Sequence, residues 1–152
     1  ETSKKQIELA QNQGKPLAVL FADLNGLKRI NDELGHEEGD RAIKDAADTL
    51  RNSLRPGDIV ARLGGDEFVA LLPDLRPEDS DHFIERLARA TRQTGEDRER
   101  AYRLSLSAGV SFMDWTRADQ TIEDVLVEAD QRMYTRKRAS AGTSFLRLVR
   151  SA

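Results

Sequence analysis

The sequence contains no cysteine, which excludes a disulfide framework and any thiolate metal site. It has no apolar run close to the roughly 20 residues that a membrane-spanning helix needs, and no segment has the pattern of a secretory signal peptide. The only two histidines, His36 and His82, lie far apart in the chain and indicate no paired metal ligands. We therefore expect a cytoplasmic domain, alone or as the cytosolic part of a larger protein, that makes no membrane contact.

The charge balance is slightly acidic. The 152 residues carry 24 basic and 27 acidic side chains, a net charge of −3. A dedicated duplex-DNA binder depends on a cationic surface, so we expect no DNA partner. A nucleotide pocket is compatible with this balance, because it needs only a few local cations. The composition, with 38% hydrophobic residues, is typical of a globular protein, and residues 1–152 fit one domain.

Hydrophobic periodicity predicts alternating strands and helices. Residues 17–22 are apolar on both faces and predict a buried central strand that ends at Asp23. Residues 59–63 and 68–72 flank a glycine-bearing turn and predict a β-hairpin, while residues 104–112 alternate as a half-buried strand does. Helices are expected at residues 2–13, 26–34, 39–54, from about 83 to 94, and behind a capping box at 121–124, with residues 145–149 as a candidate last strand.

The order of these elements, β-α-α-β-β-α-β-α, indicates the fold class. A hairpin between helices is typical of an α+β fold with a mixed or antiparallel sheet. The sequence shows no internal repeat and no linker. In the last helix, Met133 and Tyr134 are interpreted as core residues.

Carboxylates occupy three places that a fold can bring together. Asp23 ends the buried strand, and Asp66 and Glu67 lie at the hairpin tip. Asp40 lies at the start of the helix expected at residues 39–54. Such oxygen ligands suit Mg²⁺, with substrate phosphates completing its shell, and two ions about 3.5–4 Å apart can activate an attacking oxygen and stabilise a leaving one. Taken alone, each acid also fits a plain structural role, as a helix N-cap or a turn residue.

Four blocks of sequence carry a resemblance to a known family. Residues 62–68, RLGGDEF, resemble the motif that names the GGDEF family of diguanylate cyclases. Residues 23–32 (DLNGLKRIND), 35–40 (GHEEGD) and 129–137 (ADQRMYTRK) resemble further blocks of the same family, in the same order. The resemblance extends from about residue 1 to residue 137.

The resemblance implies an activity and a fold. A diguanylate cyclase joins two GTP molecules into cyclic di-GMP and releases pyrophosphate, with two Mg²⁺ or Mn²⁺ ions in each active site. The fold would be a palm-like, ferredoxin-like antiparallel sheet flanked by helices, as in nucleotide cyclases. Two copies would face each other as a homodimer, and a sensor or dimerisation domain would precede this region in the full-length protein.

The resemblance also assigns roles to residues. Asp23, Asp66 and the carbonyl of Leu24 would bind the metal ions, and Glu67 would join them or assist removal of the ribose 3′-OH proton. An Asn and a carboxylate together match the donors and acceptors of guanine, which selects guanine over adenine, while backbone amides at a helix start suit phosphates. The substrate-binding residues would be Leu27, Lys28, Asn31, Asp40, Gly64, Gly65 and Lys137.

Residues 55–58, RPGD, match the family's Arg-x-x-Asp site, which binds the product and inhibits the enzyme. Arg55 can reach a guanine edge or a phosphate with its planar fork, and Asp58 can accept hydrogen bonds from guanine. Arg86 would supply a cation to a second contact surface. The alternative interpretation is a plain turn after a helix, to which Pro-Gly-Asp is well suited.

The sequence departs from the family's pattern at several positions. The family usually has an Asp where Asn25 stands and an aromatic residue where Leu27 stands, and we expect modest effects from both. Ala141 replaces a phosphate-binding arginine, and the family's early Asp-x-Leu-Thr-Gly-Leu segment is missing, so we expect a domain truncated at its N-terminus. These departures keep a second interpretation open, in which a weak or inactive GGDEF domain senses cyclic di-GMP or GTP.

Overall fold

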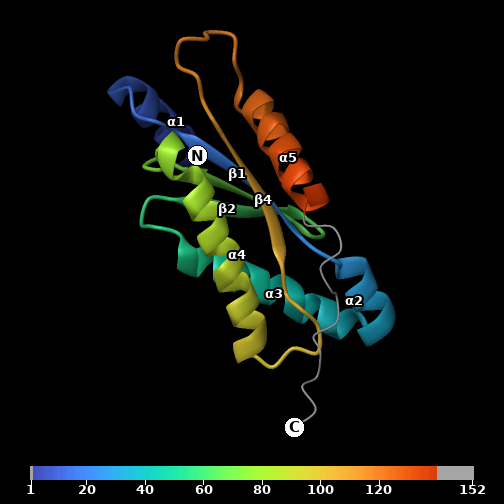
Figure 1. The fold of residues 1–152 in the computed structure, drawn as a ribbon. Coiled ribbons are helices and arrows are strands. Elements are labelled where there is room, and N and C mark those ends of the chain that lie inside the picture. Colours follow the sequence, from blue (N-terminus) through green and yellow to red (C-terminus); the bar gives the residue numbers. More distant parts are fainter. Residues whose placement is uncertain (1, 140–152) are drawn as a thin grey trace.

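Apolar strands and amphipathic helices alternate in the computed structural model, which describes residues 2–139 (Figure 1). The predicted order of elements is confirmed, with one added 3₁₀ turn. The elements are α1 (Thr2–Gln13), β1 (Ala18–Leu24), α2 (Leu27–Leu34), α3 (His36–Ser53), β2 (Ile59–Gly64), β3 (Glu67–Leu72), η1 (Pro77–Asp79), α4 (Ser80–Asp97), β4 (Leu106–Phe112) and α5 (Ile122–Ala139).

The four described strands form one antiparallel sheet in the order β2-β3-β1-β4. Strand β1 lies in the interior of this sheet, as its two apolar faces predict. The connection of β1 through helices to the β2–β3 hairpin, and then through α4 to β4, is the β-α-β-β-α-β arrangement of ferredoxin-like folds. The predicted α+β class with a palm-like antiparallel sheet is therefore confirmed.

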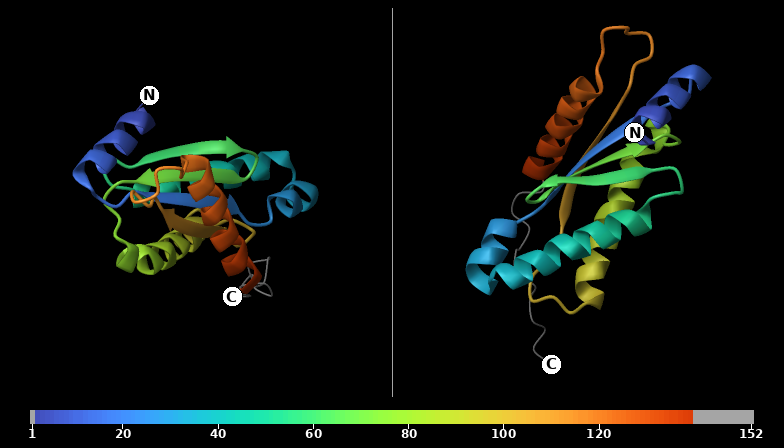
Figure 2. Two further views of the ribbon diagram at one scale, coloured as in Figure 1. Left: turned by 90° about the horizontal axis from the view of Figure 1, so that it is seen from above. Right: turned by 180° about the vertical axis from the view of Figure 1, so that it is seen from behind.

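Each face of the sheet packs against different helices. Leu20 and Ala22 of β1 belong to the main core with residues of α3 and α4, whereas Phe21 packs with Ala129 and Met133 of α5. This division follows from the period of two in a strand, which sends successive side chains to opposite faces. Figure 2 shows α3 crossing α4, while α5 follows β4 and β1.

Strand β4 lies unusually close to α5. A Cβ atom at Gly109 would lie 2.2 Å from the carbonyl oxygen of Ala129 and 2.3 Å from the amide nitrogen of Met133, so only glycine fits there. The prediction that residues 104–112 are half-buried is wrong, since six of the seven β4 residues are buried. The sequence pattern predicted that one face of β4 is exposed to solvent. The small residues on that face instead allow α5 to pack against it.

Several boundaries differ from the predicted ones. Helix α3 begins at His36 instead of residue 39, because Gly35 alone, at φ 95°, separates α2 from α3. Helix α4 continues to Asp97, and Tyr134 is 58% exposed, contrary to its interpretation as a core residue. The expected strand at residues 145–149 lies outside the described residues. Among residues 2–139, no helix combines the length and apolarity of a membrane span.

Candidate active site at the end of the sheet

The end of β1 and the tip of the β2–β3 hairpin meet at one end of the sheet. Asp23 lies directly opposite Glu67 in the β1–β3 register. The backbone N–H of Leu24 donates to the carbonyl oxygen of Asp66 at 2.8 Å, so the ladder continues into the hairpin turn. The predicted convergence of the strand end and the hairpin is therefore present.

Two glycines allow the hairpin to turn where it does. Gly64 pairs with Glu67, which leaves Gly65 and Asp66 as a two-residue loop. Gly65 has a φ of 47°, in the left-handed region that glycine adopts without a steric penalty. The tight turn leaves Asp66 half-buried and Glu67 exposed.

Asp23 is the electrostatic centre of this junction. Its side chain is 15% exposed, and its Oδ2 accepts a hydrogen bond from the Lys137 ammonium group at 3.0 Å. Burial and the adjoining Asp66 carboxyl raise the pKa of Asp23 to about 6, against the lowering effect of Lys137. Its Oδ1 is buried and has no hydrogen-bond partner among the described residues. The pair of carboxylates is thus incompletely neutralised.

A buried, unpartnered carboxylate oxygen beside a second carboxylate is a good ligand set for a hard divalent cation. Among residues 2–139, no three acidic or histidine side chains gather into a cage. Mg²⁺ commonly binds through one or two carboxylates together with water and substrate phosphates. Asp23 and Asp66 fit such a shared ion, whereas they do not suit a metal bound by the protein alone.

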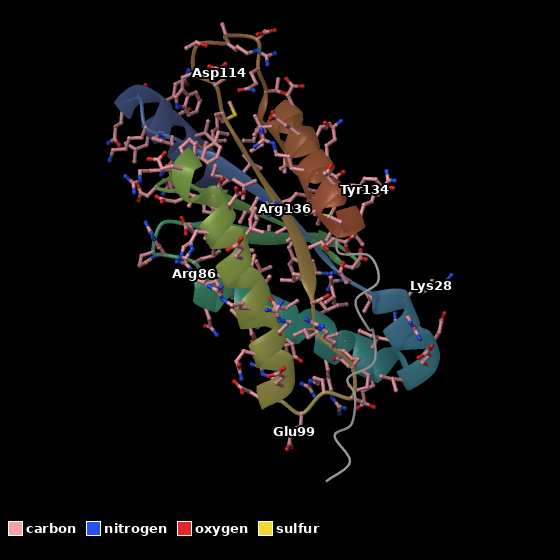
Figure 3. All side chains as sticks on the ribbon, viewed as in Figure 1. Lys28, Arg86, Glu99, Asp114, Tyr134 and Arg136 are labelled. Carbon is pink, nitrogen blue, oxygen red and sulfur yellow. The ribbon has the colours of Figure 1, made fainter. Side chains whose placement is uncertain are left out.

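Helix α2 begins immediately beside the carboxylates. Its N-cap is Gly26, at φ 72°, and no side chain of residues 2–139 caps its first turn. The first amide groups of a helix have no partner within the helix, and an anion can accept from them. Lys28 is exposed and projects outward from α2 (Figure 3), and Leu27 is packed against the main core. The helix start can therefore receive a phosphate close to the two carboxylates.

The residues expected to bind guanine come from two successive helices. Asn31 on α2 is half-buried against α3, where a Cβ at Gly39 would lie 1.7 Å from its Oδ1. Asp40 follows Gly39 and is exposed. Because Gly39 has no side chain, the Asn31 amide can pack against the turn of α3 that carries Asp40.

Asp40 also lines a cavity of about 390 Å³ between α3 and the edge strand β2. Three cationic side chains share its wall, namely Lys44, Arg51 and Arg62, and we did not single them out from the sequence. A signal for the first two was available, because Lys44 and Arg51 follow Asp40 at helical spacings of 4 and 11 residues. The remaining lining residues are Ile43, Ala47, Val60, Ala61 and Phe68.

The residues expected to bind the inhibitory product lie away from this junction. The backbone N–H of Arg55 donates to Asp58 Oδ2 at 2.9 Å, and the N–H of Asp58 donates to the Arg55 carbonyl at 3.0 Å, which closes a tight turn. Burial raises the pKa of Asp58. Arg86, labelled in Figure 3, lies on α4. Its guanidinium carbon is 5.5 Å from the centroid of the Phe83 ring. Ala141 lies outside the described residues.

The sequence matches the family described as diguanylate cyclase, GGDEF domain, over residues 1–143. The chain belongs to the GGDEF family. The GGDEF domain of PA1120 (YfiN or TpbB) from Pseudomonas aeruginosa superimposes with a TM-score of 0.75 at 33% identity, covering 90% of this chain and 84% of that one. The active GGEEF domain of a diguanylate cyclase from Vibrio cholerae gives a TM-score of 0.77 at 27% identity, covering 90% and 85%.

Curated relatives of this GGDEF domain are named for both synthesis and degradation of cyclic di-GMP. The diguanylate cyclase DgcP of P. aeruginosa is 34% identical over 91% of this chain and 20% of its own length. The bifunctional diguanylate cyclase/cyclic di-GMP phosphodiesterase MucR (34%, 88% of this chain, 19% of its length) and the cyclic di-GMP phosphodiesterase NbdA (34%, 90% and 17%), both from P. aeruginosa, are similar too. The chain spans about a fifth of the length of these relatives.

Proposed function

We propose that this GGDEF domain is a diguanylate cyclase. In each half-reaction, the 3′-oxygen of one GTP bonds to the α-phosphorus of the other, the bond from that phosphorus to the β-phosphate oxygen breaks, and pyrophosphate leaves. Two such steps close the ring of cyclic di-GMP. The observation that carries the proposal is the buried Asp23 Oδ1 beside Asp66, an atom with no hydrogen-bond partner among the described residues, because that arrangement calls for a cation.

The two carboxylates would hold divalent ions, Mg²⁺ or Mn²⁺, two in each site, with the carbonyl of Leu24 as a further ligand. When bound, such ions lower the barrier by favouring the 3′-alkoxide and by stabilising the leaving pyrophosphate. Glu67 is exposed at the hairpin tip, where a carboxylate can bind an ion or accept the 3′-OH proton. Gly64 and Gly65 leave the tip free of bulky side chains on the substrate's side.

Base recognition would fall to Asn31 and Asp40. Asn31 offers a donor and an acceptor, and Asp40 accepts from the N1–H and N2–H groups of guanine. Adenine would leave these polar groups unmatched, which disfavours ATP. The support for this role is the contact of Asn31 with α3 at Gly39, the residue before Asp40.

The triphosphate would lie between α2 and α5. The amides of Leu27 and Lys28, which no described side chain caps, suit an anion at a helix start. Lys28 and Lys137 would neutralise part of the phosphate charge. The support for Lys137 is its contact with Asp23, which places its ammonium group beside a carboxylate that would bind the metal.

Turnover requires two copies, because each domain would hold one GTP and the reaction joins two. Aligning the two substrates can supply about 7–11 kcal/mol of the barrier. In the full-length protein, a sensor or dimerisation domain would bring two GGDEF domains together. Cyclic di-GMP would return to Arg55 and Asp58, with Arg86 as a further cation, and would inhibit synthesis.

The test is incubation of the purified domain with GTP and Mg²⁺ at several protein concentrations, with chromatographic analysis of the products. We expect cyclic di-GMP and pyrophosphate, with a rate per domain that rises with protein concentration. Asp23→Asn and Asp66→Asn should abolish synthesis. Asp119→Asn is the matched control, because this carboxylate is 84% exposed in the loop before α5 and should not affect it. No product at any concentration would refute the proposal.

A second candidate is a sensor that binds cyclic di-GMP or GTP without turnover. It is favoured by the similarity to NbdA, which is named only as a phosphodiesterase. Calorimetric titration separates the two candidates. Tight binding of cyclic di-GMP or GTP together with no product would support the sensor.

A further inference from the structure

Asn25 makes three hydrogen bonds to β4 and the residue before it, on the other side of β1 from the hairpin. Its backbone N–H donates to the carbonyl oxygen of Ser105 at 2.9 Å, and its side-chain Nδ2 donates to Ser105 Oγ at 2.8 Å. Its Oδ1 accepts from Ser107 Oγ at 3.0 Å. The carboxamide therefore uses both its donor and its acceptor on β4 and the residue that precedes it.

This position lies at the centre of the turn that carries the candidate metal and phosphate groups. Asn25 follows Leu24 and precedes Gly26, the N-cap of α2. On one side, Leu24 N–H holds the turn to Asp66 at 2.8 Å. On the other side, Asn25 holds it to β4. The turn is thus fixed between the hairpin and β4, and both attachments are adjacent in the chain.

The β4 attachment is itself anchored. The segment that enters β4 is tied to α3 by Asp45, which is 1% exposed and accepts from Arg98 at 2.5 Å and from Arg100 at 2.7 Å. Tyr102 and Leu104 of the same segment are fully buried. The hydrogen bonds of Asn25 to Ser105 and Ser107, called the clamp below, therefore hold the turn to a rigid part of the fold. Buried side chains in an ion-paired segment have little freedom to move.

We propose that Asn25 is a positioning residue for the metal- and phosphate-binding turn. It acts through Ser105 and Ser107 and does not itself bind a metal ion. The inference rests on the proposed function. An Asn suits this role because Nδ2 and Oδ1 satisfy two serine hydroxyls at once. It holds Asp23 on one side and the amides of α2 on the other in the alignment that two-substrate chemistry requires.

The variants follow from these contacts. Asn25→Ala removes both side-chain bonds, and the double variant Ser105→Ala/Ser107→Ala removes the same bonds from the other side. Asn25→Asp keeps a hydrogen bond to each serine, because Ser107 Oγ already donates and the Ser105 hydroxyl can rotate to donate to the carboxylate. Ser111→Ala is the matched control: this β4 hydroxyl is buried and has no hydrogen-bond partner among the described residues. Circular dichroism and thermal unfolding establish that each variant is folded.

The readout is the kcat for cyclic di-GMP synthesis with the KM for GTP. Misplacement by about 1 Å can cost on the order of 10²-fold in rate, so Asn25→Ala should lower kcat by about 10- to 100-fold. It should also raise the KM for GTP by more than about threefold, because the displaced turn carries the phosphate-binding amides. The serine double variant should do the same, the combined triple variant should be no worse than either, and Asn25→Asp and Ser111→Ala should stay within about threefold of wild type. An unchanged kcat in Asn25→Ala, or additive losses in the triple variant, would overturn the proposal.

Failure of the proposed function is distinguishable from failure of this inference. If the wild-type domain makes no product, the variants are titrated with Mn²⁺ and a non-hydrolysable GTP analogue. Weaker Mn²⁺-dependent binding of the analogue to Asn25→Ala, with Asn25→Asp and Ser111→Ala unchanged, supports the clamp without turnover. Equal binding by all four proteins refutes it.

Discussion

Replacing Asp23 with Asn tests whether the sheet end is built for a cation, because the change removes a buried charge and keeps the shape of the side chain. Burial and the adjacent Asp66 carboxyl raise the pKa of Asp23 from 3.8 to about 6. One pKa unit corresponds to about 1.4 kcal/mol, so a fully desolvated carboxylate would destabilise the fold by about 3 kcal/mol. Solvent screening at this open end of the sheet reduces the figure to about 1–2 kcal/mol.

The sign of the pH dependence follows from linkage. A carboxyl whose pKa is raised in the folded state destabilises that state when it is ionised, so the effect grows from pH 3.8 to about pH 6 and is constant above it. The pKa of about 6 already includes the ion pair with Lys137, whose side chain is 41% exposed, so loss of that pair is not subtracted again. The net gain in the variant should be about 1–2 kcal/mol at pH 8 and should vanish near pH 4.

The assay is thermal unfolding of wild type and Asp23→Asn without metal at pH 8 and at pH 4. Every gain of about 1 kcal/mol raises Tm by about 2–4 °C in a domain of this size. Adding Mg²⁺ with a non-hydrolysable GTP analogue should raise the Tm of the wild type and leave that of the variant almost unchanged. A variant that is less stable than wild type at pH 8, or that keeps the metal-dependent rise, would show that the reasoning is wrong. Asp119→Asn serves as the control and should match wild type throughout.

Three further substitutions have definite expected outcomes. Lys137→Met should strengthen binding of Mn²⁺ alone by about fivefold, because the ammonium group competes for Asp23 Oδ2. The same variant should bind Mn²⁺–GTP more weakly than wild type. Calorimetry that shows both affinities falling together would contradict this. Asp45→Asn should lower the free energy of unfolding in urea by about 2–3 kcal/mol, because it leaves two guanidinium groups without a buried carboxylate, and a loss below about 0.5 kcal/mol would count against it. Arg55→Ala should relieve inhibition by added cyclic di-GMP in initial-rate measurements without abolishing synthesis, and unchanged inhibition would remove the role given to this turn.

Local patterns in the sequence were sufficient for the fold class and for most of the candidate site. An apolar run on both faces of residues 17–22 identified an interior strand, and two short apolar runs around Gly64 and Gly65 identified the hairpin. Asp23 follows the predicted strand, and Asp66 lies in the predicted hairpin turn. Pairing of the strand with the hairpin was therefore enough to predict that the two carboxylates meet at one end of the sheet. Boundaries were less predictable: one glycine, Gly35, separates two helices that the pattern placed four residues apart.

What the tertiary structure alone decided concerns partners that lie far apart in the chain. Lys137 reaches Asp23 across 114 residues, and Ser105 reaches Asn25 across 80 residues. Periodicity assigns a residue to a face of a strand or helix, but it does not say which distant element packs on that face. The raised pKa of Asp23 has the same origin, because it comes mainly from burial and from a carboxyl on another strand's turn. The sequence therefore identified the residue types of the site. Their charge states, partners and exposure were determined only by the packing of the sheet against α3, α4 and α5.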